Sequence, residues 1–287
     1  MRVAGFTFIR NGVRFDYPFA ESLRSLLPLC DEIVVAVGQS QDETRSRILD
    51  LQDPRIRLID TVWDESLRTG GRVLAQQTNV ALEAVRADWA FYLQGDEVLH
   101  EKDSDAIRAA MQEHLTNSRI EGFLFRYLHF FGSYQYVGDS RRWYRREIRV
   151  VRPETGVRSW GDAQGFRIEG RKLRVTAVDA DVYHYGWVKP PPLQQLKQQH
   201  FNKLWHDDTW VERNVAPVTE YDYSNGGRLR PFTGSHPAVM HERVAAQDWK
   251  FAYDASRLRQ PIREKMLDWI ERHSGWRIGE YRNYELI

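Results

Sequence analysis

The sequence predicts an α/β protein with a mostly parallel central sheet and helices on both of its faces. Short apolar runs such as residues 3–9 and 33–37 alternate with stretches of helical periodicity through the first half of the 287-residue chain. These runs are almost continuously apolar, which is typical of strands that helices cover on both sides. A chain of this length can bury a sizeable core, in one large domain or two small ones.

Each expected element follows from its own pattern. The strand at residues 3–9 leads to a helix whose apolar side chains recur at i, i+4 and i+7 from Phe19. Further strands are expected at residues 33–37, 56–59, 89–93 and 122–127, and further helices at residues 44–51, 70–86 and 107–115. Ligands of parallel sheets bind beyond the carboxyl ends of the strands, so we expect a site in the loops after Ile9, Val37 and Leu93.

The pattern changes after about residue 130. Strand-like runs are expected at residues 148–151, 173–178 and 182–185. The run Lys189-Pro190-Pro191-Pro192 then interrupts the chain, because consecutive prolines continue neither a helix nor a sheet. We therefore divide the chain into residues 1–188 and a helical C-terminal extension, residues 189–287. The last expected helix, residues 254–273, has apolar side chains four residues apart at Leu258, Ile262, Met266 and Ile270.

Composition excludes several classes of protein. Lys and Arg number 41 against 40 Asp and Glu, which argues against a protein that binds polyanions by net charge alone. The single cysteine, Cys30, excludes a disulfide framework or a cysteine-based zinc site, and its apolar neighbours predict a buried thiol. Neither a signal-peptide core nor a run of about 20 apolar residues is present, so we expect a cytoplasmic setting.

The strongest candidate site is the loop after the strand at residues 89–93. Its sequence is Gln94-Gly95-Asp96-Glu97, which brings two carboxylates to the carboxyl edge of the sheet beside a glycine that allows close approach of a ligand. Mg²⁺ and Mn²⁺ prefer carboxylate oxygens and often share their coordination shell with substrate phosphates. The alternative is a solvated turn.

Two further segments are candidates for binding. Residues 38–44 form a small polar loop before a helix, where Ser40 or Asp42 could cap the helix or leave free N–H groups for an anion; for Asp42 capping is the preferred interpretation. His184 stands among three aromatic residues just before the proline run. That position suits the wall of a pocket, with a purely structural histidine as the alternative.

Cations and a lone acid complete the candidates. The cluster at residues 139–146 contains Arg141, Arg142 and Arg145, whose guanidinium groups could bind phosphates, form a solvated basic face or hold single-stranded nucleic acid. Balanced net charge counts against the nucleic acid. Asp162 lies between two glycines beside a tryptophan, where it could act as a general base or simply form a turn.

Together these motifs resemble those of family 2 glycosyltransferases, which have the nucleotide-sugar fold called GT-A. The resemblance covers residues 1–187: residues 6–11 are similar to the opening strand and donor loop, residues 32–44 to the second strand and the loop after it, and residues 89–97 to the strand that ends in the Asp-x-Asp metal motif. It extends to a bacterial subgroup with Gln-Gly-Asp-Glu, Gly-Asp-Ser-Arg-Arg-Trp-Tyr and His-Tyr-Gly-Trp-Val-Lys-Pro-Pro.

The resemblance implies metal-dependent transfer of a sugar, with inversion, from a UDP- or GDP-sugar to a hydroxyl of a glycan or another acceptor. It implies that Asp96, His184 and Glu97 hold Mn²⁺ or Mg²⁺ and that Asp162 is the catalytic base. The implied donor contacts are Phe8, Arg10, Asn11, Gly38, Ser40, Asp42, Asn79, Gln94, Gly95, Arg141, Arg142 and Arg145. Sugar-stacking surfaces beyond residue 189 are expected from Trp205, Trp210 and Trp249, with simple packing as the alternative.

Two departures from the family pattern leave alternatives open. Gln94 replaces the first Asp of Asp-x-Asp, and Gly38 replaces an Asp that contacts uracil in many members. A sugar-phosphate nucleotidyltransferase is one alternative, although residues 9–13 lack a glycine-rich phosphate loop. A catalytically degenerate relative or a nucleic-acid-binding module is another. We expect no nucleic-acid partner; peripheral membrane association is compatible with the sequence, and oligomeric state stays open.

Overall fold

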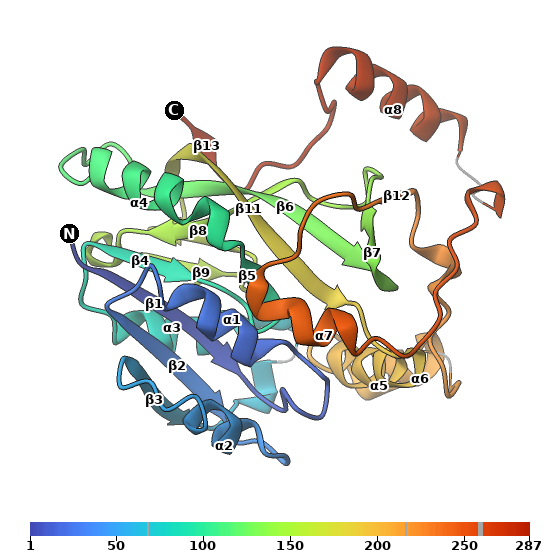
Figure 1. Ribbon diagram of the computed structural model, residues 1–287, viewed down its shortest axis with the longest axis horizontal. Coiled ribbons are helices and arrows are strands. Elements are labelled where there is room, and N and C mark those ends of the chain that lie inside the picture. The colour runs from blue at the N-terminus through green and yellow to red at the C-terminus, as the bar shows by residue number, and fades with distance from the viewer. Residues whose placement is uncertain (68, 216, 258–260) are drawn as a thin grey trace.

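The computed structural model describes residues 1–67, 69–215, 217–257 and 261–287 (Figure 1). One half of its main sheet is parallel, with strands in the order β3-β2-β1-β4. These strands are β1 (Val3–Ile9), β2 (Glu32–Gly38), β3 (Ile56–Thr61) and β4 (Trp89–Tyr92). The helices that follow them are α1 (Phe19–Leu26), α2 (Thr44–Leu49) and α3 (Arg72–Glu83). The predicted α/β class and the alternation of the first half are thus confirmed.

The two faces of this half bury different residues of the same strands. In β1, Val3 and Ile9 pack in the cluster that contains the apolar side of α1, whereas Ala4 and Phe6 pack in the cluster that contains α3. Alternation arises because successive side chains of a strand point to opposite faces. Since helices cover both faces, the strand sequence can be apolar throughout, as predicted. Cys30 is buried in the α1 cluster, which confirms the expected role.

The other half of the sheet is mixed. Its strands are β5 (Glu97–Leu99), β6 (Gly122–Phe131), β7 (Ser133–Gly138), β8 (Arg146–Val151) and β11 (Arg174–Trp187), and α4 (Ser104–Glu113) precedes β6. β8 is antiparallel to β4 and β6, whereas β11 is parallel to β6 and antiparallel to β5. A separate hairpin is formed by β9 (Val157–Trp160) and β10 (Gly165–Ile168). The runs predicted at 173–178 and 182–185 are therefore one strand, with a register shift between Ala177 and Asp181.

Residues beyond 188 add helices and two short strands. They form α5 (Pro191–Asn202), α6 (Asp208–Asn214), α7 (His241–Ala245), α8 (Ile262–Ser274), β12 (Leu229–Pro231) and β13 (Glu285–Leu286). β12 pairs with β7, and β13 pairs with β11. Short 3-10 helices occur at Glu65–Leu67, Thr69–Gly71, Glu101–Asp103, Pro153–Thr155, Tyr223–Asn225, Ala238–Met240 and Ala255–Arg257. Among the described residues, no helix combines the length and apolar character needed to cross a bilayer.

The C-terminal helix differs from its prediction. α8 begins at Ile262 rather than near residue 254, because Pro261 takes an extended conformation (φ −56°, ψ 148°) and lacks the N–H that a continuing helix would use. Leu258 lies outside the described residues. Ile262 and Met266, two members of the predicted apolar row, are 86% and 55% exposed rather than packed on the protein.

Candidate functional site

A cavity of about 810 Å³ opens at the carboxyl edge of the parallel strands, where the sequence predicted a site. Its walls come from the loops after β1 and β4, the β9–β10 turn, the end of β11 and the segment from α5 to His206. The predicted residues that line it are Phe8, Arg10, Asn11, Gln94, Gly95, Asp96, Arg142, Asp162 and His184. The fold therefore brings together side chains that are up to 176 positions apart in sequence, Phe8 and His184.

Asp96 and His184 face each other in this cavity. The distance from Asp96 Oδ2 to His184 Nε2 is 3.7 Å, and the N–H of Tyr185 donates to the carbonyl of Asp96 at 2.8 Å, which holds the loop against β11. Gly186 keeps the space between them open, because a Cβ there would lie 2.5 Å from Asp96 Oδ2 and 2.8 Å from His184 Nε2. Burial alone would raise the pKa of Asp96, but His184, Lys197 and Lys189 lower it below its ordinary value.

A second histidine determines how His184 presents its ring. His129 Nε2 lies 2.9 Å from the carbonyl oxygen of Tyr144, which can only accept, so that nitrogen carries the proton. Burial keeps the pKa of His129 well below its ordinary value, so its Nδ1 is an acceptor for His184 Nδ1–H at 3.2 Å. His184 Nε2 is then left with a lone pair directed toward Asp96. This is the tautomer that a metal ligand needs.

Two buried lysines that the sequence analysis did not select stand nearby. Lys197 in α5 donates from Nζ to the carbonyl of Gly186 at 2.8 Å and lies 3.6 Å from Asp96 Oδ2. Burial lowers the pKa of Lys197, against the effect of Asp96. Lys189 donates to the carbonyl of Asp16 at 2.7 Å, and burial, then Lys197, lowers its pKa to about 7. No sequence pattern marked Lys197 as a site residue. Lys189 was noted only as the first residue of the proline run that interrupts the chain.

Asp162 approaches the cavity from the turn between β9 and β10. The turn uses left-handed backbone at Gly161 (φ 65°) and at Ala163 (φ 66°), a conformation that is strained for alanine. Burial raises the pKa of Asp162 above its ordinary value. A carboxylate with raised proton affinity at the wall of a cavity suits a general base.

An aromatic wall forms the end of the cavity near β1. The rings of Phe8 and Trp63 have centroids 5.9 Å apart, and the Arg10 guanidinium lies 5.2 Å from the Trp63 ring. Gly38 does not line the cavity, because the Trp63 indole packs directly on it and any side chain there would collide with the ring. Trp63 was not among the predicted site residues. Its position just after β3 is the one sequence feature that could have marked it as a residue of the cavity.

Three predicted donor contacts hold loops together instead of lining the cavity. Ser40 Oγ accepts from the Asn11 N–H at 3.0 Å, and Asp42 accepts from the backbone N–H groups of Arg14 (2.6 Å) and Thr44 (3.0 Å). Asn79 Oδ1 accepts from the N–H of Ser159 at 2.8 Å and so supports β9. Small polar side chains form such bonds readily with nearby backbone groups. Their sequence pattern therefore could not distinguish a residue that binds the donor from one that holds a loop in place.

Glu97 also has a different role from the predicted one. Its side chain is fully buried, and the Arg149 guanidinium donates to it twice, at 2.8 and 2.7 Å. The Tyr127 hydroxyl (2.7 Å) and the backbone N–H of Gln94 (3.0 Å) donate to it as well. With both oxygens engaged inside the protein and no contact with the cavity, Glu97 is a structural anchor for the Gln94–Glu97 loop rather than a metal ligand.

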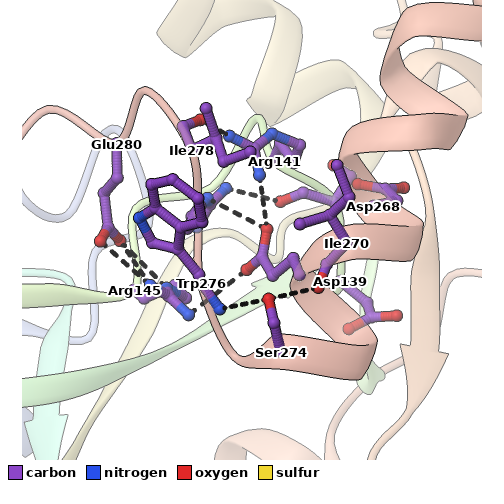
Figure 2. Close-up of polar contacts among 12 residues, drawn as sticks. Asp139, Arg141, Arg145, Asp268, Ile270, Ser274, Trp276, Ile278 and Glu280 are labelled. Atoms are coloured by element: carbon purple, nitrogen blue, oxygen red, sulfur yellow. Dashed lines mark hydrogen bonds and ion pairs between the residues drawn. The ribbon is translucent and has the colours of Figure 1, made fainter.

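The arginine cluster divides between two places. Arg142 lines the cavity, where its guanidinium lies 5.4 Å from the Trp143 ring. Arg141 instead donates to Glu271 at 2.8 Å, and Arg145 binds Glu280 through two contacts of 3.0 Å (Figure 2). The predicted phosphate contacts of Arg141 and Arg145 are therefore corrected: both hold the C-terminal segment. Partners this distant in sequence could not be inferred from the local charge pattern.

The three tryptophans predicted as sugar-stacking surfaces lie in different places, and one of them lines the cavity. Trp205 lines the cavity, whereas Trp210 stacks on His206 with ring centroids 3.5 Å apart. Trp249 is half-buried: its indole donates to the carbonyl of Gly132 at 2.8 Å and packs against the cluster that contains Phe130 and Tyr134. Within the described part of the chain, no group of three or more His, Cys, Asp or Glu side chains could hold a metal by itself. The pair Asp96 and His184 can supply two ligands.

Comparison with known proteins leaves the family open. No family model matches the chain, and no curated protein matches its sequence. Solved structures that align with part of it include TarS from S. aureus (TM-score 0.41, 14% identity, 70% of this chain and 39% of TarS). Another is TarS 1-349 with UDP-GlcNAc (TM-score 0.34, 20% identity, 47% of this chain and 37% of that one). A third is glucosyl-3-phosphoglycerate synthase from Mycobacterium tuberculosis with Mn²⁺, UDP and phosphoglyceric acid (TM-score 0.30, 16% identity).

The third alignment covers 45% of this chain and 43% of the synthase. The chain therefore spans less than half the length of each of these three structures. None of the values establishes a family.

Replacing Arg149 tests whether its ion pair with Glu97 stabilises the protein and the Gln94–Glu97 loop. Arg149→Met would leave a fully buried carboxylate without its cation, which costs about 3–5 kcal/mol. The free energy of unfolding in urea, followed by tryptophan fluorescence, measures this loss. Arg45→Met removes an exposed pair with Asp60 and should change it little. Equal effects of the two substitutions would contradict the assignment.

Glu147, beneath the β9–β10 turn, predicts a pH dependence of stability. Gln164 Nε2 donates to it at 2.9 Å, and burial raises its pKa to about 8. Because the folded state binds this proton more tightly, the free energy of unfolding should fall as pH rises from about 4.5 to about 8. Glu147→Gln should remove that fall and gain about 2–4 kcal/mol over the wild type at pH 8 but little at pH 4.5. If the free energy of unfolding depended on pH in the same way in the wild type and in Glu147→Gln, the prediction would be wrong.

Proposed function

We propose that this chain is a glycosyltransferase that moves a sugar from a UDP- or GDP-sugar to an acceptor hydroxyl with inversion. One observation carries the proposal: a single cavity joins the facing pair Asp96 and His184 to the desolvated carboxylate of Asp162. Its volume of about 810 Å³ is in the range of small-molecule sites. The motif resemblance to family 2 glycosyltransferases and the parallel half of the sheet agree with this function.

The donor atoms at the pair fit a divalent cation. Asp96 offers a carboxylate oxygen, His184 offers a lone pair on Nε2, and Gly186 leaves the space beside them open. Mn²⁺ and Mg²⁺ commonly take only one or two protein ligands and complete their shell with phosphate oxygens and water. When bound there, the ion would neutralise charge on the leaving diphosphate as a Lewis acid.

Protein cations and rings would hold the donor. One N–H of Lys197 donates to the carbonyl of Gly186, and its other N–H groups can donate to a phosphate. Arg142 lines the cavity with a planar guanidinium group whose N–H groups suit phosphate oxygens. At the other end, Phe8 and Trp63 offer aromatic faces to a nucleoside. In this scheme residues 1–188 form the catalytic domain, and the extension at 189–287 contributes Lys197 through α5.

Asp162 would act on the acceptor. It takes the proton of the acceptor hydroxyl while that oxygen forms a bond to the anomeric carbon of the sugar. The bond from this carbon to the phosphate oxygen breaks, and its electron pair leaves with the nucleoside diphosphate. Burial of Asp162 favours proton uptake, which is what a base of this kind needs.

Calorimetric titration with UDP and GDP, with and without Mn²⁺, tests the site. One of the two diphosphates should bind, and more tightly with Mn²⁺. Gly186→Ala should weaken the Mn²⁺-dependent binding by about tenfold or more, because its Cβ would occupy the space beside Asp96 and His184. Gly186 does not have a positive φ, so alanine adds no backbone strain. Val62→Ala, at an exposed side chain, is the control.

Failure of both diphosphates to bind would refute the donor site, and unchanged Mn²⁺ dependence in Gly186→Ala would refute the cation pair. Release of pyrophosphate from a nucleoside triphosphate would favour the nucleotidyltransferase instead.

Asp162→Asn tests the base. Transfer to an acceptor found by screening should slow by about 100-fold or more, since an amide cannot take the proton, while the diphosphate dissociation constant stays within about twofold. Asp60→Asn, at a carboxylate outside the cavity, should leave both quantities unchanged. Steady-state rates together with calorimetry separate the two effects. Equal transfer rates for Asp162→Asn and the wild type would remove Asp162 from this role.

A further inference from the structure

Helix α8 turns its acidic side toward the protein. Asp268 is buried and accepts from Arg228 at 2.6 Å, and Glu271 accepts from Arg141 at 2.8 Å. Arg145 adds a third contact, 3.3 Å from Glu271 (Figure 2). The helix is thus attached to the body largely by ion pairs, whereas amphipathic helices of globular proteins usually attach by an apolar face.

The apolar side of α8 faces outward. Ile262, Met266 and Trp269 are 86%, 55% and 61% exposed, and their spacing of i, i+4 and i+7 places them in one row. In Figure 1, α8 lies at the periphery, apart from the parallel half of the sheet. Contiguous exposed apolar side chains of this kind mark interaction surfaces.

Cations border this row. Arg263, Lys265 and Arg272 are exposed, and within the described part of the chain none of them forms an ion pair. The acidic residues Asp268 and Glu271 are already neutralised by arginines of the body, which leaves Glu264 as the exposed acid on α8. The outward surface of the helix is therefore both apolar and basic.

We propose that the outward row of α8 is a docking surface for a bilayer that contains anionic phospholipid. An apolar row with basic borders is typical of helices that lie in the membrane interface, where the apolar side chains enter the acyl boundary and the cations meet lipid phosphates. Tryptophan is favoured at that depth because its ring is apolar and its N–H is polar. This surface is separate from the cavity and does not depend on the proposed function.

A second copy of the chain fits the row less well. Three exposed side chains on one convex helix cover less than the about 800 Å² per partner that a stable interface buries. A symmetric contact through the row would also bring two sets of Arg263, Lys265 and Arg272 together. Anionic lipid instead neutralises these cations and buries the apolar side chains.

Vesicle sedimentation with the full chain tests the proposal. The wild type should pellet with vesicles of phosphatidylcholine and phosphatidylglycerol (3:1), bind pure phosphatidylcholine at least about tenfold more weakly, and be released in part by 0.5 M salt. The double substitution Met266→Ser with Trp269→Ser should weaken binding by about tenfold or more. Val62→Ser, which removes a side chain that is 77% exposed elsewhere, should bind like the wild type.

Circular dichroism and UDP or GDP calorimetry confirm that each variant is folded and separate this result from the donor site. Absence of wild-type binding to the anionic vesicles would overturn the proposal, as would equal binding by the Met266→Ser/Trp269→Ser variant. A dimer in analytical ultracentrifugation that this variant converts to a monomer would identify a second copy as the occupant and would also overturn it. Loss of vesicle binding with diphosphate binding intact is the expected pattern.

Discussion

The site depends on the buried ion pair between Glu97 and Arg149. Glu97 accepts from the backbone N–H of Gln94, so it defines the loop that presents Asp96. Arg149, on β8, also donates to the carbonyl of Gln164 at 3.3 Å, next to the turn of Asp162. One guanidinium therefore fixes both acidic groups of the cavity relative to the sheet. Two opposite charges with no solvent tolerate little displacement, because each compensates the desolvation of the other.

The groups that lower the pKa of Asp96 come from three parts of the chain. His184 belongs to β11, Lys197 to α5 and Lys189 to the segment between them. Together they outweigh the effect of burial on Asp96 and keep its carboxylate ionised. An anionic ligand that enters the cavity meets N–H groups of Lys197 that are already in place, and a preorganised site of this kind lowers the energy of developing negative charge.

Residues beyond 188 serve two separate surfaces. α5 closes the cavity with Lys197, and the contact between His200 and Arg14 at 3.2 Å joins it to the loop after β1. α8 lies elsewhere and is held by Arg228 together with Arg141 and Arg145, two arginines for which phosphate binding was one of the predicted roles. The arginine cluster thus links the sheet to the C-terminal segment, and only Arg142 of the three candidates remains at the cavity.

The sequence by itself predicted the alternation of strands and helices and the edge of the sheet where the cavity opens, and it offered Asp96, Asp162 and His184 as candidates that prove to line that cavity. Hydrophobic period and turn residues are local properties, and loops at the ends of parallel strands necessarily meet. Only the tertiary structure separated Asp96 from its neighbour Glu97 and brought in Lys197. Which carboxylate meets a buried arginine, and which lysine meets the cavity, depends on contacts between residues more than 50 positions apart, and no local pattern encodes them.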